Sequence, residues 1–400
     1  MDRTKFEKPP RWWSPKLSPL LVRCCRRLRE RYRTKTQRMP QVEFRGLEHL
    51  RSALAQDAGI LIAPNHSSHA DAVIMYHTAD QVGVPFYFMT SWQVLGLVPP
   101  LRSWFLRKHG CFSVDREGTD LKSFKQAVEI LQSRPNPLVI FPEGEVYHLN
   151  ERVTPFREGP ATIALSAARR SERPLVCIPC GLRYFYVADP TAELLELMNR
   201  LEESLFWRPR PDLPLPERIY RVGEGILALK ELEYLGHTKK GSIPERVKSL
   251  SDDILRPLEA KYSLDSKESP TPERVKAVRQ KAIERVEQCR ESGIDANEFF
   301  LDLDDVYLVT QMFSYPGEYV AEKASIERIA ETLDKFEEDL LPQQTATIRG
   351  VRRAVVSLGE PIVVAEFGKG KSAAQELTKV LESRVQELLD GVPADASLGK

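Results

Sequence analysis

The sequence lacks an uncharged stretch that could cross a membrane as one helix. The closest candidate, residues 81–101, has no charged residue but contains Pro85, Pro99 and Pro100. Three prolines argue against a continuous helix of about twenty residues. Arginines interrupt the apolar stretches of the basic N-terminus, so we expect no secretory signal peptide. These absences predict a cytoplasmic protein that meets a membrane only peripherally, at its surface.

Cysteine is scarce, with six residues in 400, and the spacing of these residues does not repeat. We therefore expect free thiols in a reducing compartment. Cys177 and Cys180 form a C-x-x-C pair, but they lie in an apolar, strand-like run and no second pair or histidine cluster follows. Because a structural zinc site needs four ligands, we expect no metal ion.

Net charge is also nearly absent, at +1, so the whole chain gives no signal for nucleic acid binding. The charge is unevenly placed, however, because residues 1–50 hold fourteen Lys or Arg against five Asp or Glu. Such an asymmetry points to an anionic partner at this end, either a lipid surface or nucleic acid.

Residues 1–39 have the pattern of a basic amphipathic segment. Apolar residues recur every three or four positions, as on one face of a helix: Leu17, Leu20, Leu21, Cys24, Cys25, Leu28 and Tyr32. Arginines fall largely on the other side, and Trp12 and Trp13 lie just upstream. The pattern favours an anionic membrane surface as partner and argues against nucleic acid. A helix packed on the core, with its arginines in water, is the alternative.

From residue 42, short apolar segments alternate with helical ones. We expect strands at 59–63, 84–89, 137–141 and 175–182, and helices at 71–79, 119–132 and 159–170. This alternation predicts an α/β fold with a mixed, largely parallel sheet flanked by helices. Residues 188–350 consist mainly of charged helical segments, and strand-like sequence returns at 353–367 before a last helix at 372–390. The predicted domain therefore comprises 40–187 and 351–392, with a helical insertion, 188–350, of unknown role.

The strongest candidate for chemistry is the segment Asn65-His66-Ser67-Ser68-His69-Ala70-Asp71, which follows the strand at 59–63. A histidine at a strand end faces the cleft where α/β sheets bind ligands. Asp71 can accept a proton from one ring nitrogen of His66 and leave the other free as a general base. A substrate hydroxyl would then replace the serine of a catalytic triad. A polar helix cap is the alternative reading, and His69 is a second candidate base without a carboxylate at the same spacing.

Three further segments also end predicted strands. Glu143 and Gly144, in Phe141-Pro142-Glu143-Gly144, could order a polar substrate group beside a sharp backbone turn. Arg116, at the end of 110–116, offers a fork for phosphate, or pairs with Asp115 or Glu117 on the surface. Residues 178–181 form the fourth segment. We expect all four strand ends to line one cleft.

These four blocks, in this order, resemble the PlsC-type glycerolipid acyltransferases, which include lysophospholipid and glycerol-phosphate acyltransferases. The matching segments are 65–71, 110–116, 141–144 and 176–179, and 156–161 and 359–362 resemble later elements of the family. The resemblance covers roughly residues 42–187 and 351–390.

The resemblance implies an O-acyltransferase in which His66 deprotonates an acceptor hydroxyl and Asp71 orients it. Asn65, Arg116, Glu143 and Gly144 would bind the substrate. The acyl donor would be acyl-CoA or an acyl carrier protein, the acceptor a lysophospholipid or glycerol phosphate, and no further cofactor or metal is implied. The family usually continues Thr-Arg-Ser after its FPEG block, whereas this chain has Glu145-Val146-Tyr147-His148. Arg152 or Arg157 could replace the missing arginine, or the acceptor could carry less negative charge.

Two alternatives stay open. Glu145 supports a catalytically inactive lipid-binding or scaffold protein on the same fold, although the His66–Asp71 pair argues against it. The apolar-rich stretch 92–106 could line an acyl-chain groove, dip into a bilayer, or simply pack in the core.

Overall fold

The computed structural model describes residues 11–393, apart from 117–119, 266–268, 314, 316–318, 342–344, 369 and 371. The first ten residues of the predicted basic segment lie outside this range. The described residues form two compact units, of which one comprises 195–333 and the other 11–116, 120–194 and 334–393. The unit 195–333 begins seven residues later and ends seventeen residues earlier than the predicted insertion, 188–350.

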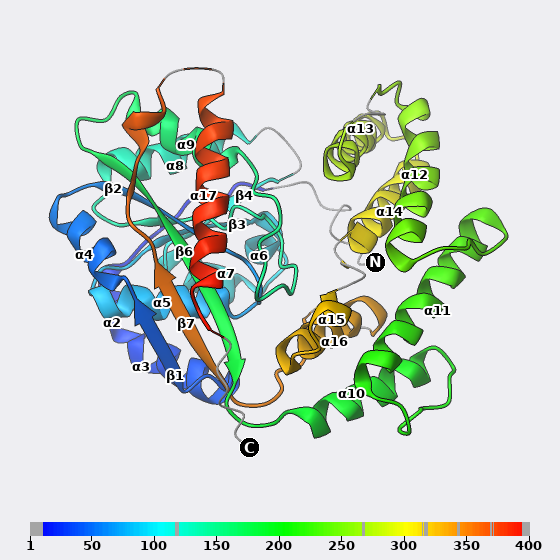
Figure 1. The fold of residues 1–400 in the computed structure, drawn as a ribbon. Coiled ribbons are helices and arrows are strands. Elements are labelled where there is room, and N and C mark those ends of the chain that lie inside the picture. The colour runs from blue at the N-terminus through cyan, green and yellow to red at the C-terminus, as the bar shows by residue number, and fades with distance from the viewer. Residues whose placement is uncertain are drawn as a thin grey trace. The chain divides into compact units, whose positions relative to one another are not determined.

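An eight-stranded sheet organises the larger unit (Figure 1). Its strands run β1-β7-β6-β2-β5-β3-β4, and β8 pairs with β6 beside this path. The neighbours from β6 to β4 are parallel, whereas β7 and β8 run antiparallel to β6. The prediction of a mixed, largely parallel sheet flanked by helices is confirmed. The strands are β1 (Gln41–Arg45), β2 (Gly59–Pro64), β3 (Tyr87–Ser91), β4 (Cys111–Val114), β5 (Leu138–Val139), β6 (Leu175–Tyr186), β7 (Arg352–Leu358) and β8 (Ile362–Val363).

Helices cover both faces of this sheet. They are α2 (Pro19–Cys24), α3 (Arg26–Arg31), α4 (Leu47–Ala55), α5 (Asp71–Val82), α6 (Trp92–Gly96), α7 (Pro100–Lys108), α8 (Leu121–Ser133), α9 (Gly159–Ala168) and α17 (Ala373–Asp390), with a π-helical turn at Tyr32–Thr36 and a 3-10 turn at Val364–Phe367. Among the described residues, no helix combines the length and the apolar character needed to span a bilayer.

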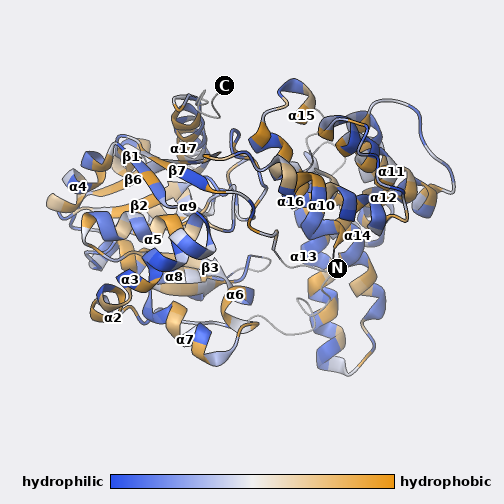
Figure 2. Ribbon diagram, turned by 90° about the horizontal axis from the view of Figure 1, so that it is seen from below, coloured by the Kyte–Doolittle hydropathy of each residue, from blue (hydrophilic) through white to orange (hydrophobic). Residues whose placement is uncertain are grey.

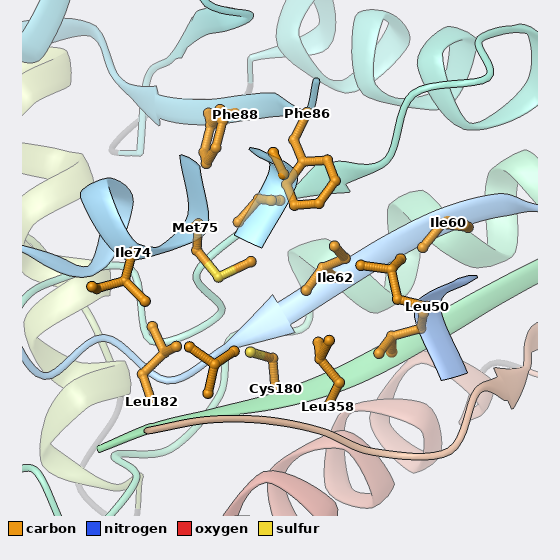
Figure 3. Packing of buried hydrophobic residues seen from close by; sticks show 14 of the residues in the cluster. Leu50, Ile60, Ile62, Ile74, Met75, Phe86, Phe88, Cys180, Leu182 and Leu358 are labelled. Atoms are coloured by element: carbon orange, nitrogen blue, oxygen red, sulfur yellow. The ribbon is translucent and has the colours of Figure 1, made fainter. Parts of the chain in front are cut away.

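The side chains of β2 show how one strand serves two cores. Ile60 and Ile62 pack with Leu50 of α4 and Ile74 of α5 on one face of the sheet (Figure 3). The intervening Leu61 and Ala63 point to the opposite face, where α8, α9 and α17 contribute the buried residues. Because successive side chains of a strand alternate between faces, an unbroken apolar strand is the sequence of a sheet covered on both sides.

The smaller unit contains helices only, within the part of it that the structure describes. They are α10 (Thr191–Ser204), which begins in the larger unit, α11 (Leu215–Leu235), α12 (Ile243–Lys261), α13 (Thr271–Ser292), α14 (Asn297–Phe313), α15 (Tyr319–Glu322) and α16 (Ile326–Leu340), which ends in the larger unit. Figure 2 shows hydrophilic and hydrophobic residues alternating along α11 to α14. Buried arginines pair with glutamates between these helices, as in Arg246–Glu231 at 2.8 Å and Arg274–Glu259 at 2.7 Å.

Two predicted strands lose residues at their ends. The strand expected at 84–89 begins only at Tyr87, after Pro85, which has no backbone N–H for a sheet. The strand expected at 137–141 is only two residues long, Leu138–Val139. The chain beyond it turns away at Pro142, so the FPEG segment lies in a loop.

Candidate active site

His66 and Asp71 lie where β2 gives way to α5. The strand ends at Pro64 and the helix begins at Asp71, so the segment between them turns back over the end of the sheet. The Nδ1 atom of His66 lies 2.8 Å from Oδ2 of Asp71. The Nε2 atom has no hydrogen-bond partner among the described residues, and the His66 side chain is 20% exposed. This geometry leaves one ring nitrogen able to take a proton from an incoming group.

The carboxylate of Asp71 is fully buried and is held on both oxygens. Besides His66, the backbone N–H of Ser68 donates to Oδ2 at 3.0 Å, and the hydroxyl of Tyr184 donates to Oδ1 at 2.5 Å. Burial and the neighbouring carboxylate hold the pKa of Tyr184 well above its ordinary value, so the phenol stays protonated and keeps donating. Three donors compensate the cost of burying this charge.

Glu143 supports His66 from the other side. Its Oε1 accepts a hydrogen bond from the backbone N–H of His66 at 2.7 Å, and its Oε2 accepts from the N–H and hydroxyl of Thr154. Burial raises the pKa of Glu143, although the hydrogen bonds from Thr154 and His66 partly offset this rise. The ring of Phe141 stacks on the imidazole of His66, with centroids 4.1 Å apart and planes 21° from parallel. The FPEG segment therefore fixes both the backbone and the ring of His66.

Two asparagine side chains continue the hydrogen bonding of β6 beyond the end of β2. Asn65 donates to the carbonyl of Leu182 at 3.1 Å and accepts from its N–H at 2.7 Å. Asn150 makes the same pair of bonds with Tyr184, both at 2.7 Å. These amides replace the missing strand, satisfy buried backbone groups and anchor both loops of the site to one strand.

Residues 41–183 match the sequence model of the family described as Acyltransferase. This chain carries an acyltransferase domain. The match supports the resemblance to the PlsC-type glycerolipid acyltransferases, and it covers β1, β2, all four motif segments and most of β6. No curated protein matches the chain.

In the acyltransferase domain, Arg116 and Gly144 lie on the FPEG side of the site. A guanidinium nitrogen of Arg116 donates to the carbonyl of Gly144 and lies 2.9 Å from a carboxylate oxygen of Glu145. Glu145, which stands where the family has a threonine, therefore offsets part of the charge of Arg116. Gly144 has a φ of +81°, and a Cβ there would lie 2.7 Å from Nε of Arg157. Glycine thus permits both the turn and the close approach of a second guanidinium.

The fourth motif of the acyltransferase domain is not a strand end, and this prediction was wrong. Residues 178–181 lie in the middle of β6, which continues to Tyr186, and Cys180 is fully buried opposite Pro64 of β2. The strand continues because its second half pairs with β7, more than 160 residues later in the chain. The residues that follow this motif in β6 do contribute to the site. The backbone of Leu182 hydrogen-bonds the side chain of Asn65, and the hydroxyl of Tyr184 donates to Asp71.

His69, the second candidate base, has a carboxylate partner that the sequence did not reveal. Its Nε2 lies 3.0 Å from Oε1 of Glu338, and Nε2 of His148 lies 3.0 Å from Oε2 of the same residue. The sequence prediction did not include Tyr184, Asn150 or Glu338 among the site residues. Their distance along the chain from the motifs does not indicate that they belong to the site, because β6, the loop after FPEG and α16 come together there only in the folded chain.

Proposed function

We propose that this acyltransferase moves a fatty acyl group from acyl-CoA or an acyl carrier protein to a hydroxyl of a glycerophospholipid precursor. The acceptor class comprises lysophosphatidate, other lysophospholipids and glycerol 3-phosphate. The observation that carries the proposal is the imidazole of His66, which pairs through Nδ1 with the buried Asp71 and presents an unpaired Nε2.

The reaction follows from this geometry. Nε2 of His66 takes the proton of the acceptor hydroxyl while its oxygen attacks the thioester carbonyl, and the resulting imidazolium is stabilised by Asp71. The tetrahedral intermediate then expels the thiolate, which receives the proton back from His66. The acyl ester and the free thiol leave, so no proton is gained or lost by the enzyme. Glu143, with both oxygens engaged by the backbone of His66 and by Thr154, acts in this proposal as a positioning residue.

Acceptor recognition rests on the two guanidinium groups beside Gly144. Arg116 already shares its charge with Glu145, whereas Arg157 is exposed and has no ion-pair partner among the described residues. We therefore assign the acceptor phosphate mainly to Arg157, assisted by Arg116. Asn65 stabilises the loop that carries His66, because its fully buried amide hydrogen-bonds the backbone of Leu182.

The test is acyl transfer by the purified full-length protein, followed by lipid mass spectrometry with mixed acyl-CoAs and a panel of the three acceptors. His66→Ala should lower turnover by about a hundred-fold or more, and Asp71→Asn should also lower it sharply. His237→Ala, at an exposed histidine of the helical unit, is the matched control and should retain the wild-type rate. If His66→Ala keeps full turnover, the mechanism is wrong; vesicle binding without transfer to any acceptor would instead favour the scaffold reading.

The basic segment before β1 supports a membrane surface as the partner. Leu20 is 74% exposed and Leu28 60% exposed, and arginines 23, 26, 27 and 31 are exposed around them. The arginine at 29 points inward and pairs with Asp80 of α5 at 2.5 Å. A helix packed on the core by its whole apolar face would bury these two leucines, whereas here Val22 and the arginine at 29 face the core while Leu20 and Leu28 face outward. We infer that α2 and α3 lie on an anionic lipid surface.

Sedimentation with anionic and with neutral vesicles checks this inference. The double change Leu20→Asp and Leu28→Asp should weaken binding to anionic vesicles by more than about tenfold. The change removes apolar contact area and adds two negative charges, which anionic lipids repel. Leu229→Asp with Leu301→Asp, at leucines that are 56% and 55% exposed in the helical unit, is the control. Equal loss in both double variants would contradict a specific role for α2 and α3.

A further inference from the structure

Two histidines and one glutamate converge next to the proposed base. His69 comes from the segment between β2 and α5, His148 from the loop after FPEG, and Glu338 from the last turn of α16, all within the larger unit. Each histidine directs its Nε2 at a different oxygen of the Glu338 carboxylate, at 3.0 Å in both cases. The three ligand-type atoms all lie within 4.8 Å of one another.

We propose that His69, His148 and Glu338 bind a divalent transition metal ion, with Zn²⁺ the best match to two imidazoles and one carboxylate. In a tetrahedral zinc site the ligand atoms lie about 3.3 Å apart, given metal–ligand distances of about 2.0–2.2 Å. The two nitrogen–oxygen separations are 3.0 Å and no pair of these atoms lies more than 4.8 Å apart, so small side-chain rotations suffice to close the cluster around an ion. Two nitrogens and one oxygen are also the ligand set of open, three-ligand zinc sites.

The surroundings of Glu338 resemble the outer shell of a metal site. The backbone N–H of Ala346 donates to Oε1 at 2.7 Å, which fixes the carboxylate and leaves Oε2 to bind an ion.

The backbone at His148 shows that the chain is bent to bring this side chain inward. His148 has a φ of +54°, in the left-handed region that non-glycine residues adopt at a cost, and only 6% of its side chain is exposed. Two residues later, Asn150 anchors the loop on β6. By contrast, the side chain of His69 is 44% exposed, so an ion can enter from solvent and keep an open coordination position there.

A bound ion would tie together three segments that are distant in the chain. His69 lies three residues after His66, and His148 lies five residues after Glu143. The metal would therefore fix both loops that position the proposed base and connect them to α16. The site does not depend on the proposed acyl transfer, because metal binding is measured without any substrate.

The experiment uses the full-length protein, free of any purification tag, stripped with a chelator and then incubated with Zn²⁺. After dialysis we expect about one zinc per chain by mass spectrometry. Glu338→Gln and His69→Gln should each bind zinc more than about tenfold more weakly in calorimetry, since they remove a direct ligand. Glu338→Gln retains an oxygen for the N–H of Ala346, and circular dichroism checks that both variants are folded.

A control and a second readout make the test decisive. His237→Gln, at an exposed histidine of the helical unit, should bind zinc like the wild type. Co²⁺ added in place of Zn²⁺ should give the intense visible absorption of a four-coordinate site in the wild type and not in Glu338→Gln. A wild type that retains no more zinc than the buffer, or folded variants that bind as tightly as the wild type, would overturn the proposal and leave a hydrogen-bonded triad.

Discussion

At the scale of single residues, the carboxylate of Asp71 depends on Tyr184. The phenol hydroxyl donates to Oδ1, while His66 and the N–H of Ser68 occupy Oδ2. Because Tyr184 is buried on β6, water cannot easily replace this donor if it is removed. The tyrosine is thus a positioning residue for the proposed catalytic pair, one step removed from the substrate.

We predict that Tyr184→Phe lowers kcat by about tenfold with little change in KM, because the orientation of His66 is lost while the acceptor contacts remain. The unfolding free energy should fall by about 1–3 kcal/mol, since a buried charged acceptor loses a partner. Steady-state kinetics and urea unfolding measure the two effects. Tyr87→Phe, at a buried tyrosine of β3, is the matched control, and equal kinetics in Tyr184→Phe and the wild type would refute the role.

The sequence could reveal the His66–Asp71 pair because both residues lie in one segment between a strand and a helix. Their hydrogen bond depends only on the local conformation of the chain, because the two residues are five positions apart. The other partners in the site depend on long-range packing, since Tyr184 follows Asp71 by 113 residues and Glu338 follows His69 by 269. The predicted substrate contacts of Asn65 and Glu143 illustrate the same limit, because only the fold shows that both side chains are engaged with the protein.

At the scale of elements, β2 and β6 are joined beyond their last paired residues by a side chain. Asn65 mimics one more residue of β2 by making both a donated and an accepted bond with Leu182. The next residue is His66, so the same amide sets the direction in which the chain leaves the sheet.

Asn65→Asp is therefore expected to destabilise the protein by about 2 kcal/mol or more. The change has nearly no effect on size, but it places a buried carboxylate oxygen against the carbonyl of Leu182 and removes a donor. Urea unfolding measures the loss. Asn136→Asp is the milder control, because among the described residues its amide donates to the carbonyl of Pro85 alone; a smaller loss in Asn65→Asp than in Asn136→Asp would contradict the bridging role.

The length of β2 followed closely from the sequence, whereas the length of β6 did not. The strand predicted at 59–63 extends over Gly59–Pro64, because its apolar residues face two cores. By contrast, β6 is four residues longer than predicted, since Arg183 to Tyr186 pair with β7. No property of residues 183–186 taken alone specifies a partner that returns after the helical unit.

At the scale of the whole molecule, the sheet is completed by a strand from near the C-terminal end of the sequence. The strand β7 inserts between β1 and β6, so the first and the sixth strands become connected only after residues 352–358 are in place. The return of strand-like sequence at 353–367 predicted that the domain is discontinuous. The position of the returning strand could not be predicted, because both edges of an incomplete sheet offer unpaired backbone groups.

The stability of the whole molecule should fall in mild acid partly because of His77. This histidine lies on α5 with its ring against Phe44, and burial, followed by the charges of three arginines at 33, 26 and 29, lowers its pKa to about 4 from 6.5. Between these two values the unfolded chain binds a proton at this position and the folded chain does not. The linkage therefore makes unfolding more favourable as the pH falls from about 6.5 to about 4.

His77→Gln removes this proton uptake, so its unfolding free energy should fall less steeply than that of the wild type between about pH 7 and about pH 5. Urea unfolding at both pH values measures the two slopes, and the comparison subtracts every other titrating group that the proteins share. His237→Gln, at an exposed position, should keep the wild-type slope. Parallel curves for His77→Gln and the wild type would show that the arginine-lined side of α5 does not suppress protonation of His77, and that the acid sensitivity of the fold originates elsewhere.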